Sequence, residues 1–286
     1  MQFYTGAPPR MRCCARLCIR RSTSVAVTVA MAVRPSELAR WRAGTEDAGF
    51  IHLNAAGASP APASCYEAMV AHLQAERTIG AYAAAPAAPD AHAAVARLLG
   101  CDRDEVALCD NAQRAWALAF SSIRLTSDDR IICFESEYAG NAVSYLQATK
   151  ETGCALEVLP MRKDGIIDVA ALGEALRAER SGRTVVSVQH VQTDSSIVQP
   201  AEVVGKLAKE HNAVYLLDTC QSIGALPVDV RALQCDFACG TGRKWLRGPR
   251  ASLAATAHFR PLLVSSRHEI GLRRLSARSY ARGACM

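Results

Sequence analysis

The chain has 286 residues, of which 50% are hydrophobic and 21% are charged, so it can bury a full core. No stretch approaches the roughly 20 consecutive apolar residues of a membrane-spanning helix, which argues against an integral membrane protein. The net charge of +6 is uneven: residues 1–36 and 251–286 each carry six arginines, whereas residues 37–250 hold 21 basic and 26 acidic residues. A mildly acidic body argues against a nucleic-acid-binding protein.

The two ends differ from the middle. Residues 1–34 are rich in arginine and lack acidic residues, which is typical of an organellar transit peptide, with a secretory signal or a frayed N-terminus as alternatives. We therefore expect the protein in a mitochondrion or plastid, or in the cytoplasm. Residues 251–286 contain no clear strand followed by a capped helix, and we expect a divergent, disordered tail there.

Between residues 50 and 250, apolar runs of strand length alternate with helical periodicity. Strands are expected at Ile51–Asn54, Val106–Cys109, Ile131–Phe134, Leu156–Leu159, Val185–Gln189, Val214–Leu217 and Phe237–Cys239. Helices are expected at 113–120, 141–151, 168–179 and 200–210, around Tyr66, Met69, Val70 and Leu73, and from a cap at Asp90 to Leu99 and Gly100. This alternation predicts an α/β fold, a mainly parallel sheet flanked by helices, whose ligands bind where strands end.

Three polar segments follow expected strands. In the segment 110–116, Asn111 can cap a helix whose free amides at Ala112 and Gln113 form an anion site, although an ordinary capped helix fits as well. The strand 214–217 delivers Asp218 to its carboxyl end. A buried carboxylate there needs a partner, which can be a loop amide, a metal or a protonated cofactor nitrogen.

The third segment, residues 240–250, brings together glycines, a hydroxyl, a guanidinium and the amine of Lys244. A solvated surface turn is the alternative, but Trp245 and Leu246 are expected to bury the loop. A lysine held in a crevice becomes a nucleophile towards carbonyls. The segment lacks P-loop spacing, and no dinucleotide-binding fingerprint is present, so a nucleotide-binding domain is disfavoured. Twelve cysteines without zinc-ligand spacing predict no metal site.

The combination of Leu217–Gly224 with Gly242–Arg250 resembles the class V aminotransferase family of pyridoxal-phosphate (PLP) enzymes, which has fold type I. Within it, the chain is most similar to isopenicillin N epimerase-like and ergothioneine-pathway sulfoxide lyase-like members. The resemblance runs from Phe50 to Arg250. It implies an N-terminal segment at 35–84, a PLP-binding large domain at 85–250 and, at 251–286, a tail in place of the family's C-terminal small domain.

The resemblance implies roles around the cofactor ring. Lys244 matches the lysine that forms a Schiff base with PLP and then serves as base at the substrate's α-carbon. Asp218 matches the carboxylate that pairs with the pyridinium nitrogen, and Gln221 matches the residue bonded to the phenolic oxygen. Tyr138 falls where the stacking ring is expected, and Thr193 falls near the phenolic oxygen and the substrate.

The resemblance also implies a phosphate site and a substrate side. Ala112 and Gln113 match the helix start that binds the phosphate, and Thr241 and Arg243 match its other wall. Asn54 lies on the segment that lines the substrate side.

Some positions depart from the family pattern. Gln113 replaces the usual threonine, and Ser195 and Ser196 replace common glycines. The only cysteine after Lys244 is Cys285, which lies in the unmatched tail, so we do not expect cysteine desulfurase activity.

The resemblance implies a PLP-dependent enzyme that acts on a small amino-acid substrate, by a lyase, epimerase or transaminase reaction, and that forms a homodimer. The alternative is a truncated, catalytically impaired isoform or gene-model fragment that binds PLP weakly or associates with a full-length partner.

Overall fold

The computed structural model describes residues 51–85, 90–178, 180–249 and 254–258, the last range by its backbone alone. The expected targeting segment and most of the expected tail lie outside these residues. The helices are α2 (Ala63–Ile79), α3 (Ala81–Ala84), α4 (Ala91–Leu99), the 3₁₀ turn η2 (Arg103–Glu105), α5 (Ala112–Ser122), α6 (Ala139–Thr152), α7 (Val169–Arg177), α8 (Ala201–Glu210) and α9 (Val230–Leu233). The strands are β1 (Val106–Cys109), β2 (Arg130–Phe134), β3 (Ala155–Leu159), β4 (Thr184–Gln189), β5 (Val214–Asp218), β6 (Phe237–Cys239) and β7 (Ala254–His258).

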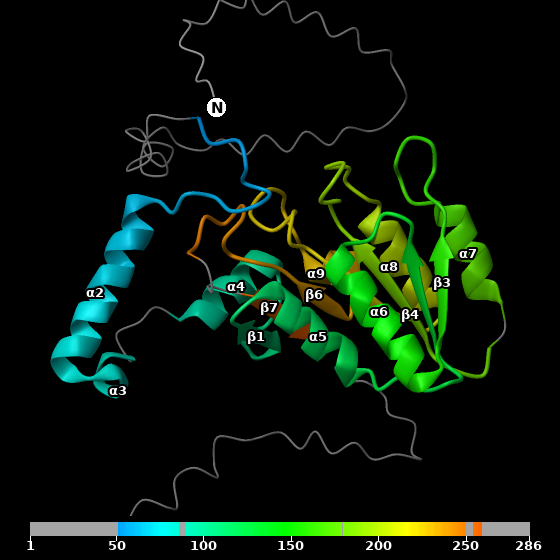
Figure 1. The fold of residues 1–286 in the computed structure, drawn as a ribbon, viewed down its shortest axis with the longest axis horizontal. Helices are drawn as coiled ribbons and strands as arrows, with labels where there is room; N and C mark the ends of the chain where they lie inside the picture. The colour runs from blue at the N-terminus through cyan, green and yellow to red at the C-terminus, as the bar shows by residue number, and fades with distance from the viewer. Residues whose placement is uncertain (1–50, 86–89, 179, 250–253, 259–286) are drawn as a thin grey trace, which may run out of the picture.

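The strands form one seven-stranded sheet in the order β1-β7-β6-β5-β4-β2-β3. The pairs β2–β3, β2–β4, β4–β5 and β5–β6 are parallel, whereas β7 runs antiparallel to both of its neighbours. Helices cover both faces, with α5 and α6 on one side and α4 and α8 on the other (Figure 1). This arrangement confirms the expected mainly parallel α/β sheet.

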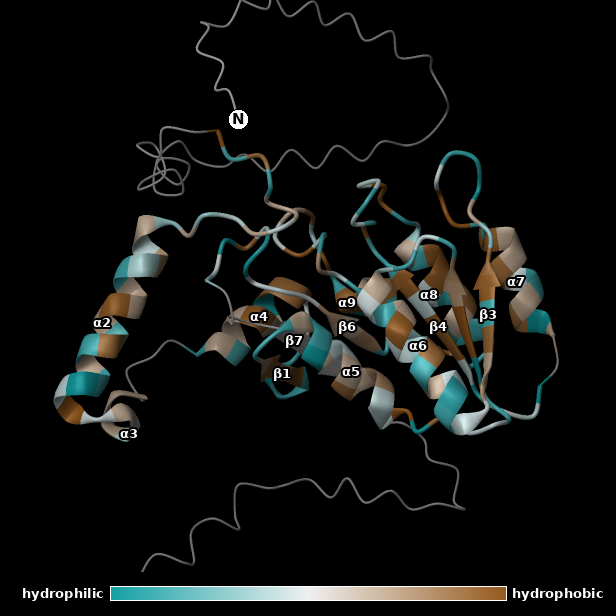
Figure 2. Cartoon of the chain, viewed as in Figure 1, coloured by the Kyte–Doolittle hydropathy of each residue, from teal (hydrophilic) through white to brown (hydrophobic). Residues whose placement is uncertain are grey.

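Two apolar clusters fill the two faces of the sheet, as the alternation of side chains along a strand requires. In β2, Ile131 belongs to the cluster that includes Trp116 of α5, and Ile132 belongs to the cluster that includes Leu172 of α7. Both isoleucines are fully buried. The central strands are accordingly hydrophobic along most of their length (Figure 2).

Six of the expected strands and all of the expected helices are present, with ends that shift by at most two residues where bounds were predicted. The Asp90 side chain accepts a hydrogen bond from Ala93 N at 3.0 Å and caps α4, while Gly100 ends that helix in the left-handed conformation. Asn111 caps α5 in the same way, through Arg114 N at 2.8 Å. Short polar caps were therefore reliable signals of helix ends.

Two expectations were wrong. Ile51–Asn54 forms no strand; instead it leads into a turn in which the carbonyl of Asn54 accepts hydrogen bonds from Gly57 N and Ala58 N. Residues 254–258, expected to lie in a strandless tail, form β7 between β1 and β6. Alanine is a weak strand former, and Thr256 is the only β-branched residue in β7, so local propensity gave no strand signal.

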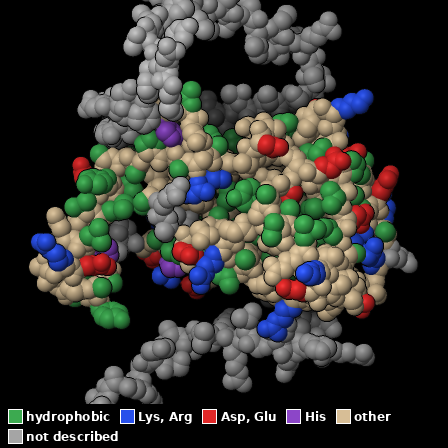
Figure 3. All heavy atoms as spheres, viewed as in Figure 1, with side chains coloured by type: hydrophobic (Ala, Val, Ile, Leu, Met, Phe, Trp, Pro, Cys, Tyr) green, Lys and Arg blue, Asp and Glu red, His purple; other side chains and the backbone are tan. Residues whose placement is uncertain are grey.

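Helix α2 confirms the expected helical periodicity but not its burial. None of its residues is buried, and Tyr66 and Leu73 are more than 60% exposed. It stands apart from the sheet (Figure 1), and hydrophobic side chains lie on its surface (Figure 3). Among the described helices, none is long and apolar enough to cross a membrane, and the described residues hold no cluster that could bind a metal ion.

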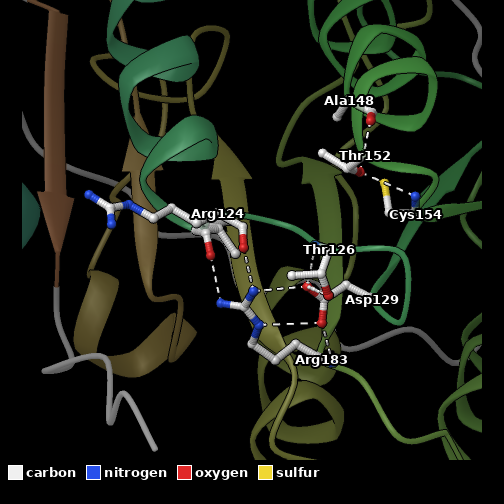
Figure 4. A network of polar contacts seen from close by, with 8 residues as sticks. Arg124, Thr126, Asp129, Ala148, Thr152, Cys154 and Arg183 are labelled. Carbon is white, nitrogen blue, oxygen red and sulfur yellow. Dashed lines mark hydrogen bonds and ion pairs between the residues drawn. The ribbon is translucent and has the colours of Figure 1, made fainter. Parts of the chain in front are cut away.

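An ion pair braces the edge of the sheet where β2 and β4 begin (Figure 4). The guanidinium of Arg183 donates to Asp129 Oδ2 at 2.8 Å and to the carbonyl oxygens of Ile123 and Arg124 at 2.6 and 2.5 Å. Asp129 is 3% exposed and also accepts from Thr126 N at 2.7 Å. Burial alone would raise the pKa of Asp129, but the hydrogen bonds from Arg183 and Thr126 outweigh it and lower that pKa.

Replacing Asp129 with asparagine should lower the free energy of unfolding at pH 7 by about 2–3 kcal/mol, because Arg183 loses its carboxylate. Asp129 has a lowered pKa in the folded state, so its contribution is present above the unfolded pKa of roughly 4 and is lost as pH falls below it. The difference between wild type and Asp129→Asn in urea unfolding should therefore shrink from pH 5 to pH 3. Asp164→Asn, which breaks the exposed Arg162–Asp164 pair, is the control and should cost at most about 0.5 kcal/mol. Equal costs for the two variants would refute the role of the buried pair.

The loop after β6 packs closely on Gly224. A Cβ built on Gly224 would lie 2.8 Å from Leu246 Cδ2, 2.9 Å from Leu246 N and 2.9 Å from the carbonyl carbon of Trp245. Gly224 also has a φ of +87°, which favours glycine. Only glycine therefore lets the loop that carries Lys244 approach this closely.

Gly224→Ala should lower the free energy of unfolding by about 2–4 kcal/mol, because the conformational cost adds to overpacking against the loop. Gly80→Ala is a matched control, since Gly80 has a φ of +85° but a Cβ added there would meet no atom within 4 Å. Its cost should be only about 1 kcal/mol. Urea unfolding compares the two, and equal losses would show that the close approach has no energetic consequence.

Candidate active site

The parallel pairing of β5 with β6 brings two loops together at the carboxyl edge of the sheet. Asp218 is in register with Cys239, so the chain leaves both strands side by side. Thr219 then bonds to the carbonyl of Cys239 twice, from its backbone N at 2.8 Å and from Oγ1 at 3.0 Å. The loop that begins at Gly240 is thereby held beside Asp218.

Asp218 lies at the end of β5 with 7% of its surface exposed. Its Oδ1 accepts a hydrogen bond from Cys220 N at 2.9 Å, and its Oδ2 accepts one from Asn141 Nδ2 at 3.1 Å. These two bonds fix the plane of the carboxylate, as a buried carboxyl group requires. Lone pairs remain for a further donor on the cavity side.

Lys244 is 6% exposed and lies in a turn closed by hydrogen bonds from Arg247 N to the Lys244 carbonyl at 3.1 Å and from Gly248 N to the Gly242 carbonyl at 2.8 Å. Among the described residues, no acidic side chain forms an ion pair with its amine. Burial and Asp218 raise the pKa of the Cys220 thiol, and Lys244 opposes them, which shows that this amine lies near Asp218 and Cys220. Trp245 is 37% exposed, more than the sequence indicated.

Helix α5 begins at the same edge. The first amides of a helix have no intrahelical acceptor, so those of Ala112 and Gln113 can bind an anion. The Gln113 side chain is occupied elsewhere, since its Nε2 donates to the Gly140 carbonyl at 3.1 Å. The position thus offers a backbone amide but no hydroxyl, consistent with the loss expected from the missing threonine.

Eight of the ten site residues predicted from the sequence line one cavity of about 130 Å³. They are Ala112, Gln113, Tyr138, Thr193, Asp218, Thr241, Arg243 and Lys244. Asn111 and Cys220 complete its lining and were not among the predicted site residues. The structure thus brings together residues from five separate segments, while their chemical roles stay predictions.

Gln221 and Asn54 do not line this cavity. Gln221 accepts from Trp245 Nε1 at 2.9 Å and donates to the Ala56 carbonyl at 3.2 Å, with Thr193 Oγ1 at 3.5 Å. Gln221 therefore joins the N-terminal segment to both loops of the site. Asn54 Oδ1 accepts from Gly57 N at 3.0 Å and stabilises the turn in that segment.

Arg243 also engages the N-terminal segment. Its Nη1 donates to the Gly57 carbonyl, and its own carbonyl accepts from Ser59 N at 2.9 Å. Arg247 Nε donates to the Pro60 carbonyl at 3.0 Å. The guanidinium predicted to bind a phosphate thus also holds the N-terminal segment against the loop that carries Lys244. Residue types carried no signal of this contact, because every residue has a carbonyl acceptor.

The buried polar group beneath Asp218 was not expected from the sequence. Asn141, which is 2% exposed, bonds to Asp218, and Glu137 bonds to Asn141 at 3.3 Å. Both lie within three residues of Tyr138, and the only signal in the sequence was two polar residues shortly after the apolar run of β2. Ser196, noted for replacing a glycine, has a φ of 60°, which explains why glycine is common there.

Two larger cavities lie elsewhere. One of about 290 Å³ lies between α5 and α6, and one of about 640 Å³ lies around Asp129, Arg130 and Arg183 at the opposite edge of the sheet. Neither has a lysine in its lining. The smaller cavity around Lys244 is therefore the candidate active site on chemical grounds rather than on size.

Comparison with known structures supports the fold. An apo cysteine desulfurase from Thermococcus onnurineus superposes with a TM-score of 0.66 at 21% identity, over 73% of this chain and 53% of that one. A C-DES variant with glycine covalently linked to its PLP cofactor gives a TM-score of 0.67 at 20% identity, over 74% and 57%.

Curated relatives are similar in sequence as well. A probable cysteine desulfurase from Methanothermobacter thermautotrophicus is 28% identical over 206 residues, or 70% of this chain and 50% of that protein. A cysteine desulfurase from Pectobacterium carotovorum is 28% identical over 58% of this chain and 41% of that protein. The chain thus spans about half the length of the curated relatives it matches. The finer likeness to the epimerase-like and sulfoxide lyase-like branch stays a prediction.

The family model described as Aminotransferase class-V matches residues 51–251, which is more than half of the chain and includes every residue of the cavity. Together with the mainly parallel sheet and the position of Lys244, this match shows that the chain belongs to the class V aminotransferase family of PLP-dependent enzymes.

Proposed function

We propose that this chain is a PLP-dependent enzyme that acts on a small amino-acid substrate through Lys244. The observation that carries the proposal is one cavity that holds a buried lysine without an acidic partner among the described residues, a buried carboxylate and a helix N-terminus. Each of these groups suits a different part of PLP: its aldehyde, its ring nitrogen and its phosphate.

The residues present fit the cofactor. The Asp218 carboxylate is held by Cys220 N and Asn141 Nδ2 and has acceptor capacity left for a protonated ring nitrogen. The amides at the start of α5, with Thr241 and Arg243 across the cavity, suit a phosphate. PLP, when bound, supplies an electron sink for reactions at the α-carbon of an amino acid.

Lys244 has two tasks in this proposal. Its Nζ holds the cofactor covalently before substrate binds, and once released it takes up the proton from the substrate's α-carbon. Its low exposure supports both tasks, because a buried amine is shielded from competing water.

Lyase, epimerase and transaminase reactions share this chemistry. The curated relatives are named as cysteine desulfurases, which supports an amino-acid substrate. We further propose a homodimer, supported by the exposed Tyr66 and Leu73 on α2, a helix with no buried residue.

Lys244→Ala should eliminate covalent PLP attachment, because the variant has no amine in the cavity. Wild-type protein incubated with PLP and reduced with borohydride should carry about one PLP per chain, detected by intact mass and mapped to Lys244 by peptide digestion. Lys206→Ala, which removes an exposed lysine paired with Glu202, should retain this label. Undiminished labelling of Lys244→Ala would overturn the assignment.

A further inference from the structure

A single amide bridges two acidic side chains beneath the candidate active site. Asn141, in the first turn of α6, donates from Nδ2 to Asp218 Oδ2 at 3.1 Å and to Glu137 Oε1 at 3.3 Å. An amide nitrogen carries two hydrogens, so it can serve both carboxyl groups at once. Glu137 lies between β2 and α6, whereas Asp218 ends β5, so the bridge joins two separate elements of the fold at this edge.

The remaining contacts of Glu137 are also inside the fold. Its Oε1 accepts from Tyr138 N at 2.7 Å, and its Oε2 lies 3.1 Å from Tyr145 Oη and 3.3 Å from Ser187 Oγ. Those two hydroxyls lie 2.6 Å apart, and both residues are at most 1% exposed. Among the described residues, no lysine, arginine or histidine forms an ion pair with Glu137. Hydroxyl groups can either donate or accept, so this surrounding accommodates a protonated carboxyl as readily as an ionised one.

The charges around Glu137 favour the protonated form. Its pKa is raised to about 7, mainly by burial and further by the negative charge of Asp218 on β5, against the lowering effect of the hydrogen bonds from Tyr138 N, Asn141 and Tyr145. The other titratable neighbours are the thiol of Cys133 on β2 and the phenol of Tyr145 on α6, whose pKa values are raised to about 12 and well above the usual value, so both are neutral. From β4 the uncharged Ser187 faces it and donates to Oε2 at 3.3 Å. Two adjacent carboxyl groups rarely ionise together in such a site.

We propose that Glu137 is a positioning residue, which carries the proton of this carboxyl pair and acts through Asn141 to keep Asp218 ionised and oriented towards the ring nitrogen of the cofactor. The inference rests on the proposed function. Ionisation of Glu137 places a second negative charge beside Asp218. That charge favours protonation of Asp218, which weakens its interaction with the protonated ring nitrogen of the cofactor.

The test compares the PLP dissociation constant of the full chain at pH 6.0 and pH 8.5, measured by equilibrium dialysis, in wild type and Glu137→Gln. Glutamine keeps the shape and stays neutral, so it should remove the part of the pH dependence that Glu137 causes. We expect affinity to fall about tenfold more in wild type than in Glu137→Gln, which corresponds to one pKa unit of coupling. The matched control is Glu135→Gln, since Glu135 accepts from Met161 N on the same segment but does not contact Asn141. It should behave as wild type.

A second measurement needs no variant and no cofactor. In PLP-free wild-type protein with ¹³C-labelled glutamate side chains, the carboxyl resonance of Glu137 should titrate with a midpoint near pH 7. The free energy of unfolding of wild type relative to Glu137→Gln should also fall as pH rises. Because the folded pKa is raised, the contribution of Glu137 is largest below its unfolded pKa of roughly 4.3 and is lost as pH rises through 7.

Identical pH profiles for wild type and Glu137→Gln, or a carboxyl midpoint below pH 5, would overturn the inference. Failure of the proposed function looks different, because then no PLP is retained on Lys244 of wild type at either pH.

Discussion

The parallel pairing of β5 with β6 is the constraint on which the site depends. It places Asp218 and the start of the Lys244 loop at one edge of the sheet, and the two bonds from Thr219 to the Cys239 carbonyl hold them there. These central strands are buried between two layers of helices because their side chains are apolar on both faces of the sheet. A buried carboxylate and a buried amine then face one cavity, although 26 residues separate them in sequence.

The N-terminal segment completes this arrangement from outside the sheet. Residues 57–60 bond to Arg243 and Arg247, and Ala56 bonds to Gln221. Both loops of the site are therefore held against the same short stretch of chain. On the inner side, Asn141 and Glu137 connect Asp218 to α6. The loop that carries Lys244 is thus held by backbone carbonyls of the N-terminal segment. Asp218 is held by the side chain of Asn141, which also bonds to Glu137.

The sequence allowed us to predict features that depend on local residue types, namely helix ends, buried strands and polar residues at the ends of strands. Asp90 and Gly100 marked the ends of α4, and apolar runs marked six strands. Residue identity at the ends of strands, together with the family resemblance, selected eight residues that line one cavity. β7 was missed because its alanine-rich sequence takes strand form only through pairing with β1 and β6. Ile51–Asn54 looked like a strand but forms none, and the exposure of α2 depends on packing that periodicity does not report.

In the site, too, some residues could be predicted from the sequence, whereas contacts that depend on the fold could not. Lys244 and Asp218 follow strands and carry rare chemistry, so they were visible in the sequence. The contacts of Arg243 with a carbonyl and of Glu137 with Asn141 depend on three-dimensional proximity alone. A polar residue next to a helix start gives no sign of how far its side chain is desolvated, and desolvation is the main reason why the pKa of Glu137 is raised.

A crystal structure of the chain grown in the presence of PLP would be the strictest test of this site. We expect continuous electron density from Lys244 Nζ to the cofactor, the ring nitrogen within hydrogen-bonding distance of an Asp218 oxygen, and the phosphate at the amides of Ala112 and Gln113. PLP bound to another lysine, or lying in the wider cavity around Arg130 and Arg183, would contradict the assignment of Lys244 and Asp218 to the cofactor.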